Sequence, residues 1–258
     1  MDRYLSGVFF FIAMNDPGQP EAIDEMRRRY AELAALAGEL AHEIKNPLSV
    51  IRMNMELLHE DFEEMDLPLA RRAVERIETV NRQCQRLDTY LKDFLEFTRF
   101  TSLELKAGNL NDQIDQVLDF FARQAEEQGV QIDRHLDGAL PGILLDSQTL
   151  QQALTNLVKN ALEAMPNGGQ LLVRTRLVRK GVALDVIDTG CGMEANMLLN
   201  MFKEFYTSKD GGTGLGLPTA KKIIEHHAGR INVQSEVGVG TCFTVEFPTP
   251  ARLSEQGE

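Results

Sequence analysis

Cysteine and positive charge are both scarce in this sequence. Its 258 residues include three cysteines, Cys84, Cys191 and Cys242, which lie far apart and form no C-x-x-C pair. This spacing argues against a structural zinc site and favours a reducing compartment, so we expect a cytoplasmic protein. Lys and Arg number 27 against 39 Asp and Glu, for a formal net charge of −12. Nucleic-acid binding rests on clustered basic residues, so we expect no nucleic acid as partner.

A long apolar segment is also missing. The one membrane candidate, Tyr4 to Met14, has eleven residues. As a helix it rises about 17 Å, whereas the hydrocarbon core of a bilayer is about 30 Å thick. No A-x-A-like cleavage site follows, and residues 15–18 (NDPG) indicate a turn, which makes a signal peptide the weaker alternative. A β-strand or the stump of an upstream domain is the favoured interpretation, with no membrane span in this chain.

The hydrophobic periodicity changes near residue 100. Before it, apolar residues step by three or four along two runs, which predicts two long helices joined by an acidic connection at residues 59–68. A lone hairpin buries two such seams poorly, so we expect two hairpins to pair as a four-helix bundle in a homodimer. A monomeric hairpin packed on the rest of the chain is the alternative. The seams are Leu33, Leu36, Leu40, Ile44, Leu48, Ile51, Met55 and Leu58, and then Ile77, Val80, Cys84, Leu87, Leu91, Phe94 and Thr98.

Residues 101–250 predict a mixed α/β domain. Helices covering one face of a mixed sheet form an α/β sandwich, so the expected fold class is α+β, with a helical hairpin at 30–100 followed by this sandwich. Residues 1–29 are then a strand or signalling-helix remnant and 251–258 a tail. The expected helices are 109–128, 147–165 and about 218–227, and the expected strands are 130–136, 143–146, 171–178, 182–187, 230–235 and 241–247.

Two asparagines four residues apart, Asn156 and Asn160, lie on one face of the helix expected at 147–165. Asparagine is a poor residue for a helix interior, because its amide competes for backbone hydrogen bonds. The side-chain carbonyl of asparagine can ligate Mg²⁺, a cation that prefers oxygen. On this segment alone, a magnesium site and two solvent-facing amides are equally good explanations.

A second motif, residues 186–193 (VIDTGCGM), places Asp188 at the end of a strand. Glycines on either side of Cys191 let another group approach the backbone closely. A carboxylate at the mouth of a pocket can accept a hydrogen bond from an exocyclic amine such as that of adenine. The Asp-Thr-Gly string is also typical of an aspartic protease, which needs a second such Asp or a symmetric partner, and a plain turn is the third possibility.

A third motif, residues 211–218 (GGTGLGLP), opens the last helix. Glycines that lead into a helix N-terminus, with Pro218 in its first turn, suit a polyphosphate, because backbone N–H groups and the helix dipole meet there. No Gly-Lys-Ser/Thr follows, so this is not a P-loop, and no βαβ unit frames it as a dinucleotide fingerprint.

In this order, the three motifs and residues 202–209 (FKEFYTSK) resemble the N, G1, F and G2 boxes of the histidine-kinase ATP-binding domain, of the GHKL type, over about residues 103–247. The resemblance implies ATP and Mg²⁺ as cofactors, with Asn160 as the metal ligand and Asp188 reading adenine. It also implies a mobile lid at residues 194–212, from which Lys209 reaches the terminal phosphates. The further nucleotide contacts that it implies are Asn156, Gly190, Gly192, Gly212, Thr213, Gly214, Leu215, Gly216 and Thr241.

Residues 40–48 (LAHEIKNPL) resemble the H-box of the sensor histidine kinases of two-component systems, and the hairpin resembles their dimerisation and phosphoacceptor domain. The resemblance implies that His42 accepts the γ-phosphate of ATP and passes it to an Asp of a response-regulator receiver domain. Glu43 is the expected general base. Asn46, one turn from His42, is the residue expected to orient water when the partner is dephosphorylated. Pro47 cannot donate to the carbonyl of Glu43 and is expected to kink the helix.

Residues 1–30 are too short for the sensor domain of such kinases, so the input is expected upstream or from another protein. Two other function classes stay open. An ATPase or chaperone-like clamp with the same nucleotide fold would lack the H-box. A non-enzymatic pseudokinase scaffold would not require Asn160, Asp188 and Lys209.

Overall fold

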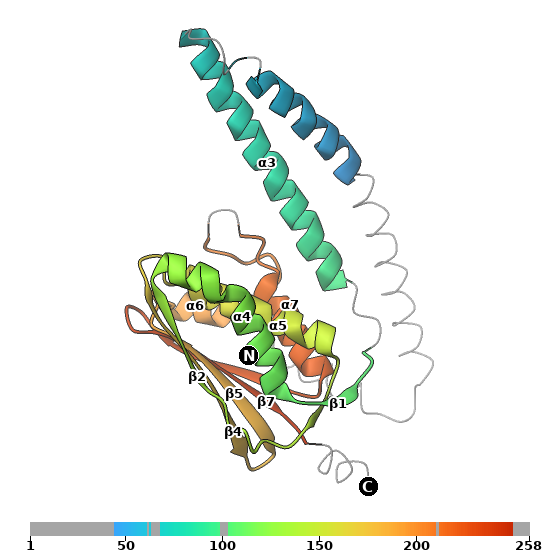
Figure 1. Ribbon diagram of the computed structural model, residues 1–258, viewed down its shortest axis with the longest axis vertical. Coiled ribbons are helices and arrows are strands. Elements are labelled where there is room, and N and C mark those ends of the chain that lie inside the picture. Colours follow the sequence, from blue (N-terminus) through green and yellow to red (C-terminus); the bar gives the residue numbers. More distant parts are fainter. Residues whose placement is uncertain (1–43, 61, 63–67, 99–102, 210–211, 250–258) are drawn as a thin grey trace, which may run out of the picture. The chain divides into compact units, whose positions relative to one another are not determined.

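The computed structural model describes residues 44–60, 62, 68–98, 103–209 and 212–249 (Figure 1). The chain divides into two compact units, and the boundary falls between Thr101 and Ser102. In the described ranges, no helix combines the length and the apolar character that crossing a bilayer requires. The helix and strand predicted before residue 44, and His42 and Glu43 with them, lie outside these ranges.

The first unit contains two helices. Residues 44–60 are helical, so the first helix continues through two residues, His59 and Glu60, that were predicted to belong to the connection. The second helix, α3 (Pro68–Thr98), begins with the proline that was predicted to end the connection. Proline suits the first helical position, because no helical hydrogen bond needs its missing N–H there.

Half of the predicted seam residues that the structure describes are exposed, and only three of them are buried. Leu48, Ile77 and Cys84 are 5–7% exposed. The exposed half is 37% to 47% exposed, and its members recur every seven residues along each helix. One hairpin therefore leaves a continuous apolar stripe uncovered. This exposed stripe consists of Ile44, Ile51 and Leu58 on the first helix and Val80, Leu87 and Phe94 on α3.

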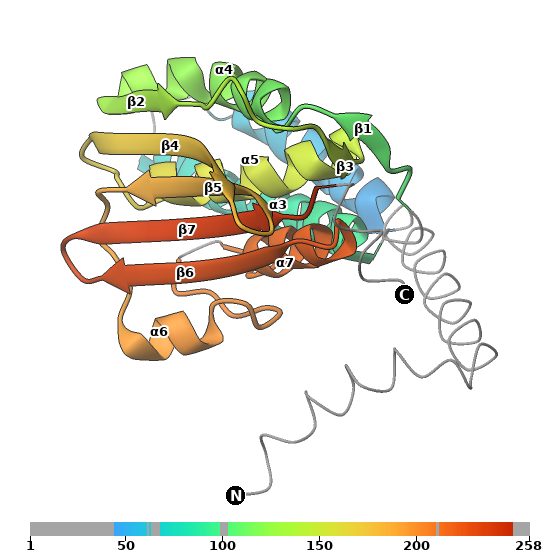
Figure 2. The ribbon, with the colours of Figure 1, turned by 90° about the horizontal axis from the view of Figure 1, so that it is seen from below.

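The second unit is an α/β sandwich, as predicted. Its five-stranded sheet has the order β2-β4-β5-β7-β6; β2 pairs with β4 in parallel, and the other pairs are antiparallel. Three helices, α4, α5 and α7, lie on one side of this sheet (Figure 2). The sheet strands are β2 (Val130–His135), β4 (Gly169–Val178), β5 (Gly181–Asp188), β6 (Arg230–Glu236) and β7 (Gly240–Phe247), and the helices are α4 (Leu110–Gln128), α5 (Ser147–Glu163) and α7 (Gly216–His226).

The ends of α4 and α5 follow from their capping residues. The side chain of Asn109 accepts a hydrogen bond from the N–H of Asn111 at the start of α4, and Gly129 ends this helix with a φ of 71°. Asp146 accepts from the N–H of Thr149 and is thus the N-cap of α5, one of the two candidates from the sequence. These caps determine where α4 begins and ends and where α5, which carries the two asparagines of the first motif, begins.

Three elements differ from the prediction. Helix α7 begins at Gly216, two residues before the expected start. The short helix α6 (Ala195–Asn200) and the strand β1 (Lys106–Gly108), which pairs with β3 (Ile143–Leu145), were not predicted. Helix α6 buries none of its residues, so it has no apolar periodicity to detect, and three residues of strand are too few to show alternation.

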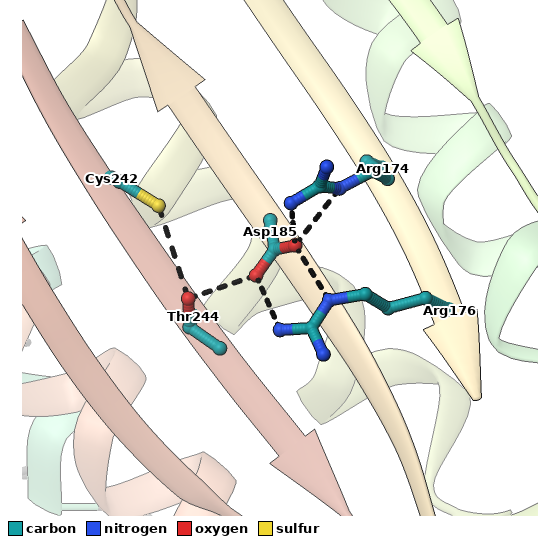
Figure 3. A network of polar contacts seen from close by, with 5 residues as sticks. All are labelled: Arg174, Arg176, Asp185, Cys242 and Thr244. Carbon is teal, nitrogen blue, oxygen red and sulfur yellow. Dashed lines mark hydrogen bonds and ion pairs between the residues drawn. The ribbon is translucent and has the colours of Figure 1, made fainter. Parts of the chain in front are cut away.

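The other face of the sheet carries a polar cluster centred on Asp185 of β5 (Figure 3). Asp185 lies opposite Arg174 of β4 and Thr244 of β7, and its side chain is 2% exposed. Arg174 and Arg176 donate to its carboxylate at 2.8–3.3 Å, and the Thr244 hydroxyl donates at 2.8 Å. Burial pushes the pKa of Asp185 up, but these hydrogen bonds outweigh it and hold the pKa below its ordinary value.

Candidate nucleotide-binding site

Helix α5 presents both asparagines to other parts of the site. The Oδ1 atom of Asn160 accepts a hydrogen bond of 2.7 Å from the ammonium of Lys209. The Oδ1 atom of Asn156 lies 3.6 Å from the position that a Cβ at Gly216 would take, so this amide faces the start of α7. Both asparagines are half-buried, which argues against the alternative of two solvent-facing amides.

Asp188 ends β5 and is 4% exposed. Burial raises the pKa of its carboxyl group above the ordinary value; backbone N–H groups of Gly190 and Thr241 and the charge of Lys209 act in the opposite direction. Thr241, the cross-strand partner of Asp188 on β7, is 6% exposed, and its hydroxyl lies 2.9 Å from that of Ser235. This arrangement holds a buried acceptor in a fixed place, as recognition of an amine requires.

The glycines of the second motif are required by close packing. A Cβ at Gly190 would lie 2.7 Å from the carbonyl oxygen of Ala164, at the end of α5. Gly192 has a φ of 66°, and a Cβ there would lie 2.0 Å from the carbonyl oxygen of Glu236. The close approach predicted for this loop is therefore made by the chain's own backbone, which fixes the loop beside α5.

The glycine-rich loop leads into α7 as predicted from its sequence. Gly214 has a φ of 69°, and a Cβ there would lie 2.5 Å from the carbonyl carbon of Phe205, so only glycine fits. Leu215 is the N-cap of α7 and provides no side-chain cap hydrogen bond. Thr213 and Gly212 precede it, and the N–H of Gly212 donates to the carbonyl of Lys209 at 3.1 Å. A helix N-terminus without a side-chain cap suits an anionic group.

Lys209 links residues 194–212, the segment predicted to be a lid, to α5. Besides its hydrogen bond to Asn160, its ammonium forms an ion pair with the Oε2 atom of Glu163. The carboxylate of Glu163 also lies 3.9 Å from the ammonium of Lys159. The structure thus brings together Asn160 and Lys209, which are 49 residues apart in the chain.

These groups fit a magnesium ion bound with nucleotide phosphates. The side-chain oxygen of Asn160 already accepts a hydrogen bond from a positively charged group, and an oxygen ligand is the kind that Mg²⁺ prefers. Over the described part of the chain, no group of three or more His, Cys, Asp or Glu side chains is arranged to hold a metal. A magnesium ion here would depend on phosphate oxygens for much of its coordination, as is usual for this metal.

Of the three catalytic residues predicted in the first unit, the structure describes one, Asn46, which was predicted to orient water for dephosphorylation. Asn46 is exposed on the helix of residues 44–60. The expected roles of His42 and Glu43 stay predictions.

Two protein families match this chain. Residues 32–103 match the His Kinase A (phospho-acceptor) domain, and residues 145–251 match the histidine kinase-, DNA gyrase B- and HSP90-like ATPases. The chain belongs to the sensor histidine kinases of two-component systems. This histidine kinase therefore carries its phosphoacceptor region in the first unit and its ATPase region in the second.

Curated relatives resemble it over most of its length. The sensor histidine kinase ZraS of Escherichia coli (strain K12) is 34% identical over 227 residues, which are 87% of this chain and 48% of ZraS. Sporulation kinase E of Bacillus subtilis is 31% identical over 237 residues, which are 90% of this chain and 31% of that kinase. The histidine kinase described here thus spans about half, or less, of the length of these relatives.

Solved histidine kinase structures also resemble this chain. Full-length ShkA in complex with AMPPNP aligns with a TM-score of 0.66 and 26% identity, over 83% of this chain and 45% of ShkA. The catalytic domain of the histidine kinase ThkA aligns with a TM-score of 0.53 and 29% identity, over 58% of this chain and 99% of that domain.

The sequence motifs of this histidine kinase do not include Glu163, although its carboxylate contacts Lys209. A signal was present, because Glu163 follows Asn160 by three residues and so shares its helix face. An exposed acid on a helix is ordinary, however, and its ion pair with Lys209 joins residues 46 positions apart.

Proposed function

We propose that this histidine kinase transfers the γ-phosphoryl group of ATP to His42 and passes it to an aspartate of a response-regulator receiver domain. The observation that carries the proposal is the convergence of Asn160, Lys209 and Asp188 on one site, in a chain whose other unit bears the H-box. The ATP analogue named in the ShkA structure supports ATP as the nucleotide.

The residues of the site would divide the work as follows. Asp188 accepts a hydrogen bond from the adenine amine, and Lys209 contributes a point charge near the terminal phosphates. Asn160 is the protein ligand to Mg²⁺, which neutralises phosphate charge when bound. In the transfer, a ring nitrogen of His42 bonds to the γ-phosphorus, the bond between this phosphorus and the bridging oxygen breaks, and ADP leaves. Glu43 takes the proton from the other ring nitrogen.

We infer that the first unit works as a homodimer. The exposed stripe is apolar, recurs every seven residues and lies on both helices. A second hairpin offers the same stripe, so the two can cover each other around a twofold axis and complete a four-helix bundle.

Labelling with radioactive ATP tests the proposed reaction. The wild-type chain should acquire label that is stable in base and lost in acid. His42→Ala should remove this label and leave nucleotide affinity near the wild-type value, because the nucleotide site lies in the other unit. His59→Ala, a histidine in the same unit, is the matched control and should keep the label. Histidine-bound label in the His42→Ala variant would show that the assignment is wrong.

A further inference from the structure

Lys209 makes a contact that the proposed reaction does not need. Its ammonium lies 2.7 Å from Oδ1 of Asn160 and is paired with the carboxylate of Glu163. We propose that Glu163 is a positioning residue that, with Asn160, clasps Lys209 and the lid to α5, and that binding of a magnesium–nucleotide complex must open this clasp. The inference rests on the proposed function, because it takes Asn160 as the magnesium ligand.

The competition follows from the shared oxygen. Mg²⁺ binds an oxygen ligand at about 2.1 Å. An ion at that distance from Oδ1 of Asn160 would lie only about 4 Å from the ammonium of Lys209, if each took one lone pair of the carbonyl oxygen. A divalent cation and an ammonium at this separation repel each other strongly in a partly buried site. The phosphates that accompany the ion are stronger acceptors for an ammonium than an amide oxygen, so Lys209 is the group that we expect to leave Asn160 for the phosphates.

Local backbone contacts fix the part of the lid from which Lys209 extends. The N–H of Lys209 donates to the hydroxyl of Thr207 at 3.1 Å, and its carbonyl accepts from the N–H of Gly212 at 3.1 Å. These two bonds hold the backbone N–H and carbonyl of Lys209 in place. The clasp therefore ties a backbone position with defined local contacts to α5.

Glu163 supplies the charge that makes this contact more than a single hydrogen bond. The side chains of Glu163 and Lys209 are 38% and 42% exposed, so the ion pair alone is weak. Together, Asn160 and Glu163 give the ammonium two acceptors, one of them charged. Because the clasp stabilises one position of the lid, weakening it should shift the lid towards open positions.

Hydrogen exchange of the full chain in the absence of nucleotide tests the clasp. Peptides from residues 195–209 should exchange several-fold faster in Glu163→Gln and in Lys209→Gln than in the wild-type chain. The double variant should exchange no faster than Lys209→Gln alone, since loss of the ammonium already removes the contacts with both Asn160 and Glu163. Lys159→Gln, which removes the other lysine near Glu163, is the matched control and should exchange at the wild-type rate.

Calorimetric titration with Mg²⁺-ADP supplies the second measurement. Glu163→Gln should bind this probe several-fold more tightly, because less of the protein must first open. Weaker binding by Glu163→Gln would instead make Glu163 part of the metal site and overturn the proposal. Equal lid exchange in wild-type and Glu163→Gln chains would overturn it as well. Failure of the wild-type chain to bind nucleotide would count against the proposed function, and the exchange comparison would still decide whether the clasp exists.

Discussion

The side chain of Asp185 accepts hydrogen bonds from two arginines and a threonine (Figure 3). Asp185→Ala should lower the free energy of unfolding by about 2–3 kcal/mol, because it removes charged hydrogen bonds and leaves two arginines without this partner. The loss stays below the largest values for buried ion pairs, since the arginine side chains are 47% and 43% exposed. Urea titration measures this loss. As a control, Asp119→Ala, which removes a 70%-exposed partner of Arg134, should lower the free energy of unfolding by less than about 1 kcal/mol.

The same carboxylate should make stability depend on acid. The pKa of Asp185 in the folded state is held below the ordinary value, whereas in the unfolded chain it is about 3.9. The unfolded state therefore binds the proton first as the pH falls. The stability from Asp185 is complete above the unfolded pKa and is lost as the pH drops towards the folded pKa. In urea titrations from pH 7 to 3, Asp185→Asn should lack this share of the acid loss; identical acid profiles would contradict the role given to Asp185.

Asn46 offers a separation of two activities at one helix face. It is exposed and follows His42 by four residues, a spacing at which we expect its amide to hold a water in line with an acyl phosphate. We expect Asn46→Ala to keep self-labelling within a few-fold of wild type and to lose most phosphatase activity toward the cognate response regulator. Both rates are measured on one purified variant. A parallel loss of both would mean that Asn46 serves only as the residue before Pro47.

At the scale of elements, the sequence predicts best where a local rule acts. The helices α4 and α5 combine apolar periodicity with Asn109 and Asp146 as caps, and their starts agree with prediction to within a residue. Helix α7 starts earlier than predicted because Gly216, which disfavours helix on its own, lies against Asn156 of α5. The start of α7 therefore depends on a tertiary contact, which helix propensity alone does not predict.

The site divides in the same way. The asparagines, Asp188 and the glycines stand in short strings whose spacing is visible in the sequence. The Lys209–Glu163 pair of the site depends on segments that the fold brings together, and so does the Asp185 cluster on the other face of the sheet. Arg174 and Arg176, at alternate positions of one strand and so on one face, hinted at an acidic partner on the neighbouring strand. Only the register of β4 against β5 identifies it as Asp185.

Two glycines of one loop should respond oppositely to the same change. Gly214→Ala should lower the free energy of unfolding by about 1–2 kcal/mol or more, because alanine pays for a positive φ and its Cβ would overlap Phe205. Gly216→Ala should leave stability unchanged or raise it by up to about 1 kcal/mol, because Gly216 is helical and its Cβ would make an ordinary contact of 3.6 Å. Thermal unfolding of both variants without nucleotide measures this; equal losses would contradict the loop geometry.

For the whole molecule, the proposed reaction needs groups from both units. The H-box belongs to the first and the nucleotide site to the second, and each folds around its own core. A substitution in one unit should therefore leave binding by the other unit measurable, as we expect for nucleotide binding by the His42→Ala variant. The proposed dimerisation is different, because it would cover the exposed stripe on both described helices of the first unit.

Leu87 lies in the exposed stripe of α3 and is 47% exposed. We expect Leu87→Glu to convert the dimer into a monomer in light-scattering measurements, because a twofold bundle would bring charge into its apolar seam on both chains. The variant should keep its helical circular dichroism, since the side chain is already half exposed within one hairpin. Phe120→Glu, at a 77%-exposed position of α4 in the other unit, is the matched control and should keep the dimer mass. A wild-type chain that is monomeric at all concentrations would remove the dimer proposal, and the stripe would then have to be covered by some other surface.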